Sequence, residues 1–166
     1  MEYQLTHQEI TPHKHDRKLK LLVDDLQSPA NYGMMIRAAE AMGVEEIIFF
    51  SQDIKTITTK IKRSSRSAEK YIRVRFTQNL EEELEKFKKE KLEIIGLEYT
   101  SHSKNIKNHQ FSPAPKVLVC GNESTGLSKK IISQCDFCVH LPMFGENSSM
   151  NVVMATSIAL WELVTV

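Results

Sequence analysis

Residues 116–131, KVLVCGNESTGLSKKI, place a short apolar run directly before a loop that contains two glycines. The run Val117–Cys120 is typical of a buried strand, and Gly121 ends it. From Gly121 onward the segment fits the phosphate-binding pattern G-x-x-x-x-G-K-S/T except at Leu127, which replaces the lysine. A triphosphate site needs that positive charge, whereas Glu123 in this loop repels a polyphosphate. The segment therefore predicts a strand and a loop suited to a neutral or cationic ligand.

Apolar runs of strand length recur along the chain and alternate with helical periodicity. Strands are expected at residues 19–26, 46–51, 72–77, 92–99, 116–121 and 137–143. Helices are expected at residues 32–42, at 80–91 and from about Met150 to the end. Ser28 and Asn31 offer capping oxygens before the first helix, and Gly43 suits the position after it.

Strands that alternate with helices predict an α/β fold, a mostly parallel sheet with helices on both faces. In such sheets, ligands bind outside the carboxyl ends of the strands. The loops after Leu26, Tyr99, Cys120 and Leu141 are therefore the places to expect a site.

The composition is that of an ordinary globular protein, with 41% hydrophobic and 26% charged residues. A formal net charge of +1 does not point to a polyanionic partner. Residues 1–18 are polar and aperiodic, which predicts an N-terminal arm before a single domain at residues 19–166. There is no signal-peptide pattern and no apolar run of membrane-spanning length, so we expect a cytoplasmic protein that makes no membrane contact.

The chain has three cysteines, an odd number that argues against a disulfide framework. Cys135 and Cys138 form a C-x-x-C pair, to which Cys120 and His140 could add two zinc ligands. A buried strand explains the same residues better, because apolar side chains alternate around them and no second C-x-x-C exists. We therefore expect no metal.

One stretch of the chain is strongly basic. Between residues 55 and 75 a single acid, Glu69, accompanies Lys55, Lys60, Lys62, Arg63, Arg66, Lys70, Arg73 and Arg75. Such a patch can neutralise phosphates, and its centre, KRSSRS, makes Lys62, Arg63 and Arg66 candidate nucleic-acid contacts. The alternative is a solvated face that is balanced by the acidic helix after it.

Two further segments carry polar side chains where a ligand is expected. In the first, Arg37 lies amid apolar residues near a helix start, a setting that suits an anion unless a core carboxylate pairs with it. In the second, Ser148, Ser149 and Asn151 precede the last helix. One of these three is expected to cap that helix, and the others exceed what capping requires.

Together these segments resemble the SpoU/TrmH family of RNA ribose 2′-O-methyltransferases, within the SPOUT superfamily. The family's first motif, N-x-G-x-x-x-R-x-A, stands here as Asn31, Gly33, Arg37 and Ala39. The second, G-N-E-x-x-G-L, stands as Gly121, Asn122, Glu123, Gly126 and Leu127. The third, I-P-M-x-G-x-x-x-S-L-N-V, stands as Leu141, Pro142, Met143, Gly145, Ser149, Met150, Asn151 and Val152. Only Leu141 and Met150 depart from these motifs, and the match runs from about Lys18 to the end.

The resemblance implies an α/β knot whose C-terminal part forms a trefoil knot and binds S-adenosylmethionine. It also implies a homodimer with the active site near the subunit interface. The implied cofactor contacts are Leu97, Gly121, Leu141, Met143 and Met150.

The implied catalytic residues are Arg37, Glu123, Ser149 and Asn151. Because a guanidinium keeps its proton at physiological pH, we expect Arg37 to grip a phosphate and stabilise the developing alkoxide rather than act as a base. Glu123 and Asn151 would orient Arg37, Ser149 would contact the ribose or phosphate, and Asn31 would help to hold the target nucleotide. The expected reaction is methylation of a ribose 2′-hydroxyl in tRNA or rRNA, without a metal.

Three alternatives remain beside this interpretation. A non-catalytic RNA-binding relative would be expected to lack Arg37, Glu123 or Asn151, yet all three are present. A base-methylating SPOUT enzyme would lack the first and third motifs. A P-loop NTPase would require ATP hydrolysis by the pure protein. The sequence does not name the RNA, whose choice must rest on the basic stretch, the arm, the dimer or a partner protein.

Overall fold

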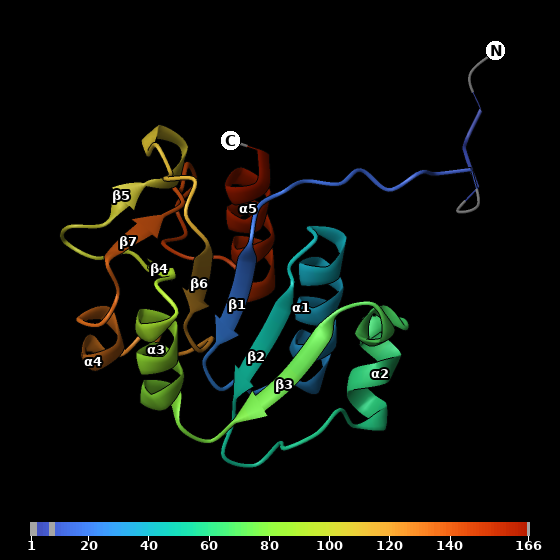
Figure 1. Ribbon diagram of the computed structural model, residues 1–166, viewed down its shortest axis with the longest axis horizontal. Coiled ribbons are helices and arrows are strands. Elements are labelled where there is room, and N and C mark those ends of the chain that lie inside the picture. Colours follow the sequence, from blue (N-terminus) through green and yellow to red (C-terminus); the bar gives the residue numbers. More distant parts are fainter. Residues whose placement is uncertain (1–2, 7–8, 166) are drawn as a thin grey trace.

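A computed structural model describes residues 3–6 and 9–165. Seven strands form one sheet in the order β3-β2-β1-β6-β4-β7-β5, and every ladder between them is parallel (Figure 1). The strands are β1 (Leu19–Val23), β2 (Glu46–Phe50), β3 (Arg73–Thr77), β4 (Glu93–Leu97), β5 (Lys104–Asn105), β6 (Lys116–Cys120) and β7 (Phe137–His140). The predicted parallel α/β sheet is thereby confirmed.

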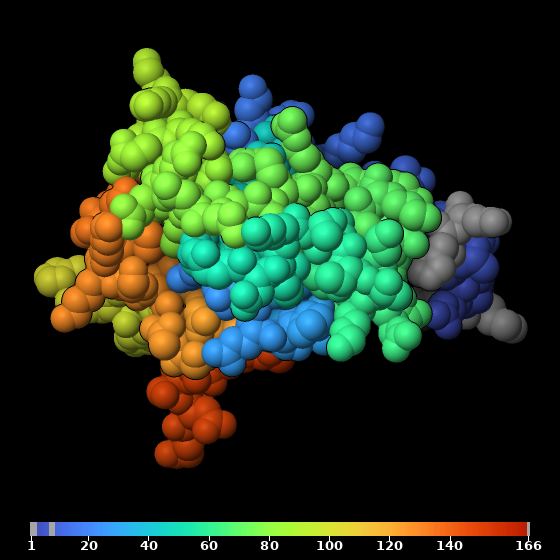
Figure 2. Space-filling view, turned by 90° about the horizontal axis from the view of Figure 1, so that it is seen from below, coloured from blue at the N-terminus to red at the C-terminus, as the bar shows by residue number. Residues whose placement is uncertain are grey.

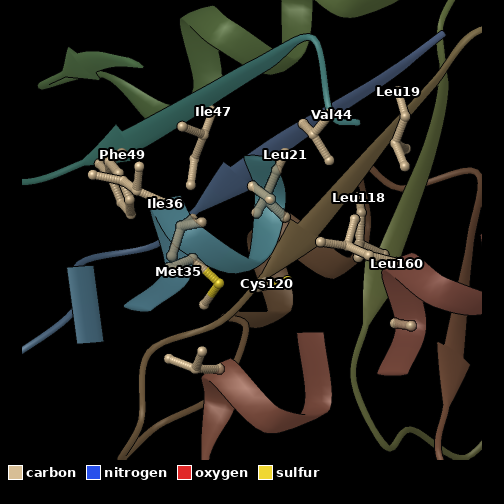
Figure 3. Packing of buried hydrophobic residues seen from close by; sticks show 14 of the residues in the cluster. Leu19, Leu21, Met35, Ile36, Val44, Ile47, Phe49, Leu118, Cys120 and Leu160 are labelled. Carbon is tan, nitrogen blue, oxygen red and sulfur yellow. The ribbon is translucent and has the colours of Figure 1, made fainter. Parts of the chain in front are cut away.

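Helices cover both faces of the sheet, as predicted. They are α1 (Pro29–Ala41), α2 (Thr59–Ser65), α3 (Leu80–Lys89), α4 (Lys129–Ile132) and α5 (Val152–Thr165). Side chains of α1, α2 and α5 share one apolar cluster with the sheet, and those of α3 together with Ile131 of α4 share a second. Figure 3 shows the first cluster, where Met35 and Ile36 of α1 and Leu160 of α5 meet the strands. The trefoil knot stays a prediction.

Burial on both faces explains why the central strands are apolar without alternation. Leu21 and Leu22 of β1 are adjacent in sequence, point to opposite faces, and are both fully buried. Val119 and Cys120 of β6 are likewise buried, one in each cluster. Such continuous apolar runs are typical of strands in a sheet covered on both sides.

The strand register brings the expected ligand loops to one edge. Val23 of β1 and Leu97 of β4 both pair with Cys120 of β6, and Leu97 also pairs with Val139 of β7. The strands therefore end level with one another, and the loops that follow them meet. The loop after β6, residues 121–127 and hereafter the glycine loop, emerges between the ends of β1 and β4. The connections that follow β1 and β4 lead to opposite sides of the sheet order, away from β6. Ligands of parallel sheets usually bind at such a point.

Several element boundaries differ from the sequence expectation. Helix α1 begins at Pro29, a favoured first residue, so Asn31 lies inside the helix and is not a cap. Helix α5 begins at Val152 because Asn151 Oδ1 accepts a hydrogen bond from the Val153 amide at 2.8 Å. Gly43 has the expected positive φ, 65°. Helices α2 and α4 and strand β5 were not expected.

The described residues before Leu19 contain no helix or strand and run outward from the sheet (Figure 1). His15 Nε2 lies 2.9 Å from the carbonyl oxygen of Met42, which ties this arm to the end of α1. None of the helices in the described part of the chain combines the length and apolar character needed to cross a membrane.

Gly33 allows α1 and α2 to approach closely. A Cβ atom at this position would lie 2.0 Å from Ser64 Oγ, 2.4 Å from the Ile61 carbonyl oxygen and 2.7 Å from the Ser65 nitrogen. Two of these are backbone atoms, so a side chain at residue 33 would push α2 away from α1. Gly33 thus has a packing role that the sequence motif alone did not reveal.

A network of ion pairs joins the sheet to α3. Arg75 of β3 donates two hydrogen bonds to the Glu83 carboxylate, at 2.9 and 2.8 Å, and a third to Glu46 at 3.1 Å. The Glu83 side chain is 3% exposed, and Lys86 lies 3.2 Å from it. Hydrogen bonding from Arg75 lowers the pKa of Glu83 below its usual value, although burial opposes this shift.

We expect Gly33→Ala to destabilise the fold by about 1–3 kcal/mol, because the added methyl group overpacks the contact between α1 and α2. Helix propensity alone would instead stabilise the variant by roughly 1 kcal/mol. Urea unfolding measures the difference. Gly145→Ala is the matched control, since no atom lies within 4 Å of the added Cβ and little change is expected. A stabilised Gly33→Ala variant would contradict the contact.

We expect Glu83→Gln to lower the free energy of unfolding at pH 7 by about 1–3 kcal/mol, since hydrogen bonds to a charged partner are lost. Solvent access to Arg75 keeps this below the cost of breaking a fully buried pair. Because the folded-state pKa is lowered, the contribution is present above pH of about 4.3 and disappears on further acidification.

The measurement is urea unfolding at pH 7 and at pH 3–4, in which the difference between wild type and Glu83→Gln should shrink at acidic pH. Glu82→Gln is the control, because the side chain of Glu82 is 60% exposed and pairs only with Lys86. Equal effects of the two substitutions at pH 7 would show that the network contributes nothing beyond surface charge.

Candidate functional site

The glycine loop is bound to the segment after β1 by four hydrogen bonds, one of which Gln27 Nε2 donates to Ser124 Oγ at 3.1 Å. Asn122 Nδ2 donates to the Asp25 carbonyl oxygen at 2.9 Å. The Glu123 carboxylate accepts from Asn31 Nδ2 at 2.7 Å and from the Gln27 amide at 3.1 Å. Asn31 and Glu123, which come from the first and second motifs, are thus direct partners although they are far apart in sequence.

On its other side the glycine loop is bound to the segment after β4. Glu98 Oε2 accepts a hydrogen bond from the Leu127 amide at 2.8 Å, and Glu98 Oε1 accepts from the Tyr99 amide at 2.9 Å. Gly126 has a φ of 63°, and a Cβ there would lie 2.2 Å from Glu98 Oε2. Because Gly126 has no side chain, the Glu98 carboxylate can approach the backbone of the glycine loop.

Two adjoining cavities, hereafter the strand-end cavities, lie where these loops meet. Their volumes are about 130 and 350 Å³, and both are bordered by Leu97, Glu98, Ser149, Met150 and Ala155. All five expected cofactor contacts line at least one of them: Leu97, Gly121, Leu141, Met143 and Met150. Of the expected catalytic residues, Glu123 and Ser149 line them as well.

The walls of the strand-end cavities combine apolar, neutral polar and acidic side chains. Carboxylates come from Glu98 and Glu123, and no lysine or arginine is among the lining residues. The apolar part comes from the side chains of Leu97, Leu141 and Met143. Such walls suit a ligand that combines flat or aliphatic parts with a positive charge.

Sequence reasoning did not identify Glu98 as a site residue. This residue borders both strand-end cavities and also holds the glycine loop in place. Its position was readable in principle, because it is an acid directly after a buried strand at the carboxyl edge of the sheet.

The thiols of the chain are not poised for chemistry. Burial raises the pKa of Cys120 to about 12 and that of Cys135 to about 12, so both remain protonated at neutral pH. Cys138 and Cys135 fill the space beside Gly96, where a Cβ would lie 2.8 Å and 3.2 Å from their sulfur atoms. Among the residues that the structure describes, no group of three or more His, Cys, Asp and Glu side chains could hold a metal ion.

Arg37 lies apart from the strand-end cavities. It is exposed, and its side chain has no hydrogen-bond or ion-pair partner within residues 3–6 and 9–165. Glu123, which was expected to orient it, is bound to Asn31 and the Gln27 amide instead. Asn151 caps α5 and is likewise absent from the lining of the strand-end cavities.

Arg37 borders a different cavity of about 610 Å³ between α1 and α2, hereafter the α2 cavity. Its lining consists of Ser28, Pro29, Ala30, Met34, Arg37, Lys60, Arg63, Ser64 and Arg66. Figure 2 shows this side of the molecule, with the start of α1 in light blue next to α2 in green. Of the expected RNA contacts, Arg63 and Arg66 line the α2 cavity, whereas Lys62 borders another cavity together with Lys55 and Lys70.

Known proteins resemble this chain in sequence and in fold. A Bacillus subtilis protein, YacO, which its name assigns to the TrmH family of tRNA/rRNA methyltransferases, is 29% identical over 150 residues, 90% of this chain and 59% of YacO. The SpoU methyltransferase AviRb from Streptomyces viridochromogenes, crystallised with the cofactor AdoMet, matches with a TM-score of 0.81 and 27% identity, covering 92% of this chain and 61% of that one.

A TrmH/SpoU tRNA-modifying enzyme from A. aeolicus has a TM-score of 0.80 and 26% identity, with 90% of this chain and 75% of that chain covered. The chain spans about 60% of the length of YacO and AviRb. The model of the SpoU rRNA methylase family matches residues 18–161, which include the whole sheet and all three motifs. The chain belongs to the SpoU rRNA methylase family.

Proposed function

We propose that this protein transfers a methyl group from S-adenosylmethionine to a ribose 2′-hydroxyl of tRNA or rRNA in the cytoplasm. The observation that carries the proposal is the pair of strand-end cavities, which gather residues of the second and third motifs around a space with apolar, neutral polar and acidic walls. AviRb, which shares the fold and 27% of the sequence, was crystallised with AdoMet. YacO and the A. aeolicus enzyme carry names that refer to tRNA or rRNA.

The strand-end cavities fit the methyl donor chemically. Leu97, Leu141 and Met143 offer apolar surface for an adenine ring and an aliphatic chain. Glu98 and Glu123 supply negative charge without a competing lysine or arginine, which suits a sulfonium cation. When bound there, S-adenosylmethionine supplies an electrophilic methyl group.

The side chains around the cavities then have separate tasks. Glu98 and Asn122 hold the glycine loop, so that its backbone groups face the cavity in one arrangement. Ser149, which borders both strand-end cavities, is placed to contact the ribose. Arg37, which has no partner among the described side chains, is available to grip a phosphate next to the target ribose and to stabilise the developing alkoxide.

We expect Arg37→Ala to reduce methyl transfer to RNA by about 10²–10³-fold, the usual loss when one stabiliser of a developing oxyanion is removed. Binding of S-adenosylmethionine should not change, because Arg37 lies outside the strand-end cavities. Transfer of labelled methyl groups to total tRNA and to rRNA measures the first quantity, and calorimetry measures the second.

Arg37→Lys is the matched control, since it keeps the charge but loses the two-pronged grip on phosphate. If Arg37→Lys retains part of the wild-type methyl transfer and the pH profile is unchanged, the result supports a role of Arg37 in binding phosphate. A shift of the pH profile would instead make Arg37 a proton acceptor. Full activity of Arg37→Ala would remove this residue from the mechanism.

The exposed face of α5 supports a homodimer. Met154, Ile158 and Trp161 follow one another at helical spacing and are 60%, 44% and 57% exposed. Apolar side chains grouped on one helix face are typical of a protein interface. We therefore propose that a second copy covers this face, which agrees with the dimer that the motifs imply.

We expect Trp161→Glu to dissociate the dimer, because it places a charge in the centre of the apolar face. Sedimentation equilibrium of wild type and variant measures the mass directly. Tyr71→Glu is the control, since Tyr71 is an exposed aromatic residue, 77% exposed, in a turn remote from α5 in sequence. A wild type that sediments as a monomer, or a variant that remains dimeric, would refute this interface.

A dimer also allows a test of where Arg37 acts. Subunits with Arg37→Ala and subunits with Glu123→Ala are each expected to be inactive alone. If Arg37 serves the site of its partner, randomly mixed dimers should recover roughly a quarter of the wild-type activity, because half are mixed and each has one complete site. If Arg37 serves its own chain, mixing should restore nothing.

A further inference from the structure

Helix α2 sorts the basic residues of its segment onto different sides. Lys60, Arg63 and Ser64 are three and four residues apart, so they share one side, and all three line the α2 cavity. Ile61 and Ser65 are fully buried against the fold. Lys62 is neither buried nor part of the lining of the α2 cavity. It borders a different cavity, which is also lined by Glu69 and Arg75. A continuous basic run in the sequence is therefore two separate surfaces in the structure.

The α2 cavity holds positive charge without compensation. Lys60, Arg63 and Arg66 lie there with Arg37, and no acidic side chain is among the lining residues. None of these four side chains has an ion-pair partner within the described part of the chain. Lys62, by contrast, shares its cavity with an acid, Glu69. The α2 cavity thus combines a concave shape with four basic side chains and no acid among its lining residues, whereas Glu69 lies among the basic side chains of the cavity that Lys62 borders.

The backbone holds this arrangement in place. Gly33 brings α2 against α1 next to Arg37, as described above. At the other end of α2, Arg66 and Ser67 have positive φ values of 51° and 71°, an unfavourable conformation for residues with side chains. Arg66 thereby ends α2 while its side chain remains at the cavity. Strain of this kind persists only where the surrounding structure enforces it.

The geometry points to the α2 cavity as a binding site for consecutive phosphates of single-stranded RNA, held by Lys60, Arg63 and Arg66 beside Arg37. The inference rests on the proposed function and deepens it, because it states which basic residues hold the RNA backbone. It adds Lys60 to the expected contacts and removes Lys62. Arginine and lysine side chains around an open cavity match phosphate oxygens, and sequence-independent contacts of this kind position an RNA strand.

The test is RNA binding at a series of salt concentrations, performed without S-adenosylmethionine. A labelled single-stranded RNA of mixed sequence is titrated with wild type and with Lys60→Gln, Arg63→Gln, Arg66→Gln and Lys62→Gln. Each lost phosphate contact lowers the slope of log K against log salt by about 0.7 and weakens binding about fivefold at 0.1 M salt. All four positions are exposed, so the variants should fold normally, which urea unfolding verifies.

The inference holds if Lys60→Gln, Arg63→Gln and Arg66→Gln lower the slope while Lys62→Gln does not, and if Arg63→Lys retains it. It is overturned if Lys62→Gln has the same effect as Arg63→Gln, or if fewer than two of the three cavity variants change the slope. Wild-type binding without salt dependence would also overturn it. Binding of S-adenosylmethionine is measured separately on the same proteins, so failure of the α2 cavity and failure of the proposed methyl transfer are distinguishable.

Discussion

The glycine loop is held from both sides by hydrogen bonds, and the arrangement of the site depends on this constraint. Asn122 and Glu123 bind the segment that leads from β1 into α1, and Glu98 binds the loop from the β4 side. Parallel strands that end level with one another bring these three segments within reach. Because the loop is anchored at both ends, the sheet fixes the position of the cavity walls that the loop contributes.

The start of α1 separates two regions of opposite charge. On one side the strand-end cavities have carboxylates and no lysine or arginine, and on the other the α2 cavity has four lysine or arginine side chains and no acid. The neutral side-chain amide of Asn31 donates a hydrogen bond to the Glu123 carboxylate and leaves its negative charge in place. If Glu123 were paired with Arg37 instead, each group would reduce the charge of the other. The neutral contact therefore leaves the negative charge on one side of α1 and the positive charge on the other side without mutual compensation.

The sheet was predictable because its central strands are mostly apolar runs, and their order along the chain is visible in the sequence. Boundaries were less predictable, since Leu26 is apolar and buried although strand pairing stops at Val23, before Asp24 and Asp25. Helix α2 has only seven residues, of which Ile61 and Ser65 are buried, too few for a periodic pattern.

The five expected cofactor contacts that line the strand-end cavities followed from the family resemblance, but Glu98 and the contacts between distant segments did not. The Asn31–Glu123 hydrogen bond spans 92 positions in sequence, and no local pattern encodes it. The same is true of the split between Lys62 and Arg63, which are adjacent in the chain but border different cavities. The rotation of a short helix, which is fixed by Gly33 and Ile61, determines that split.

The two edge strands of the sheet also limit how the protein can associate with other chains. One edge strand, β5, has only two residues, and the other, β3, carries Arg73 and Arg75. Short or charged edges pair poorly with further strands, so neither edge is a template for aggregation or for a sheet continued across subunits. Assembly is thereby directed to helical surfaces, and the sheet can remain open at both edges in a crowded solution without polymerising.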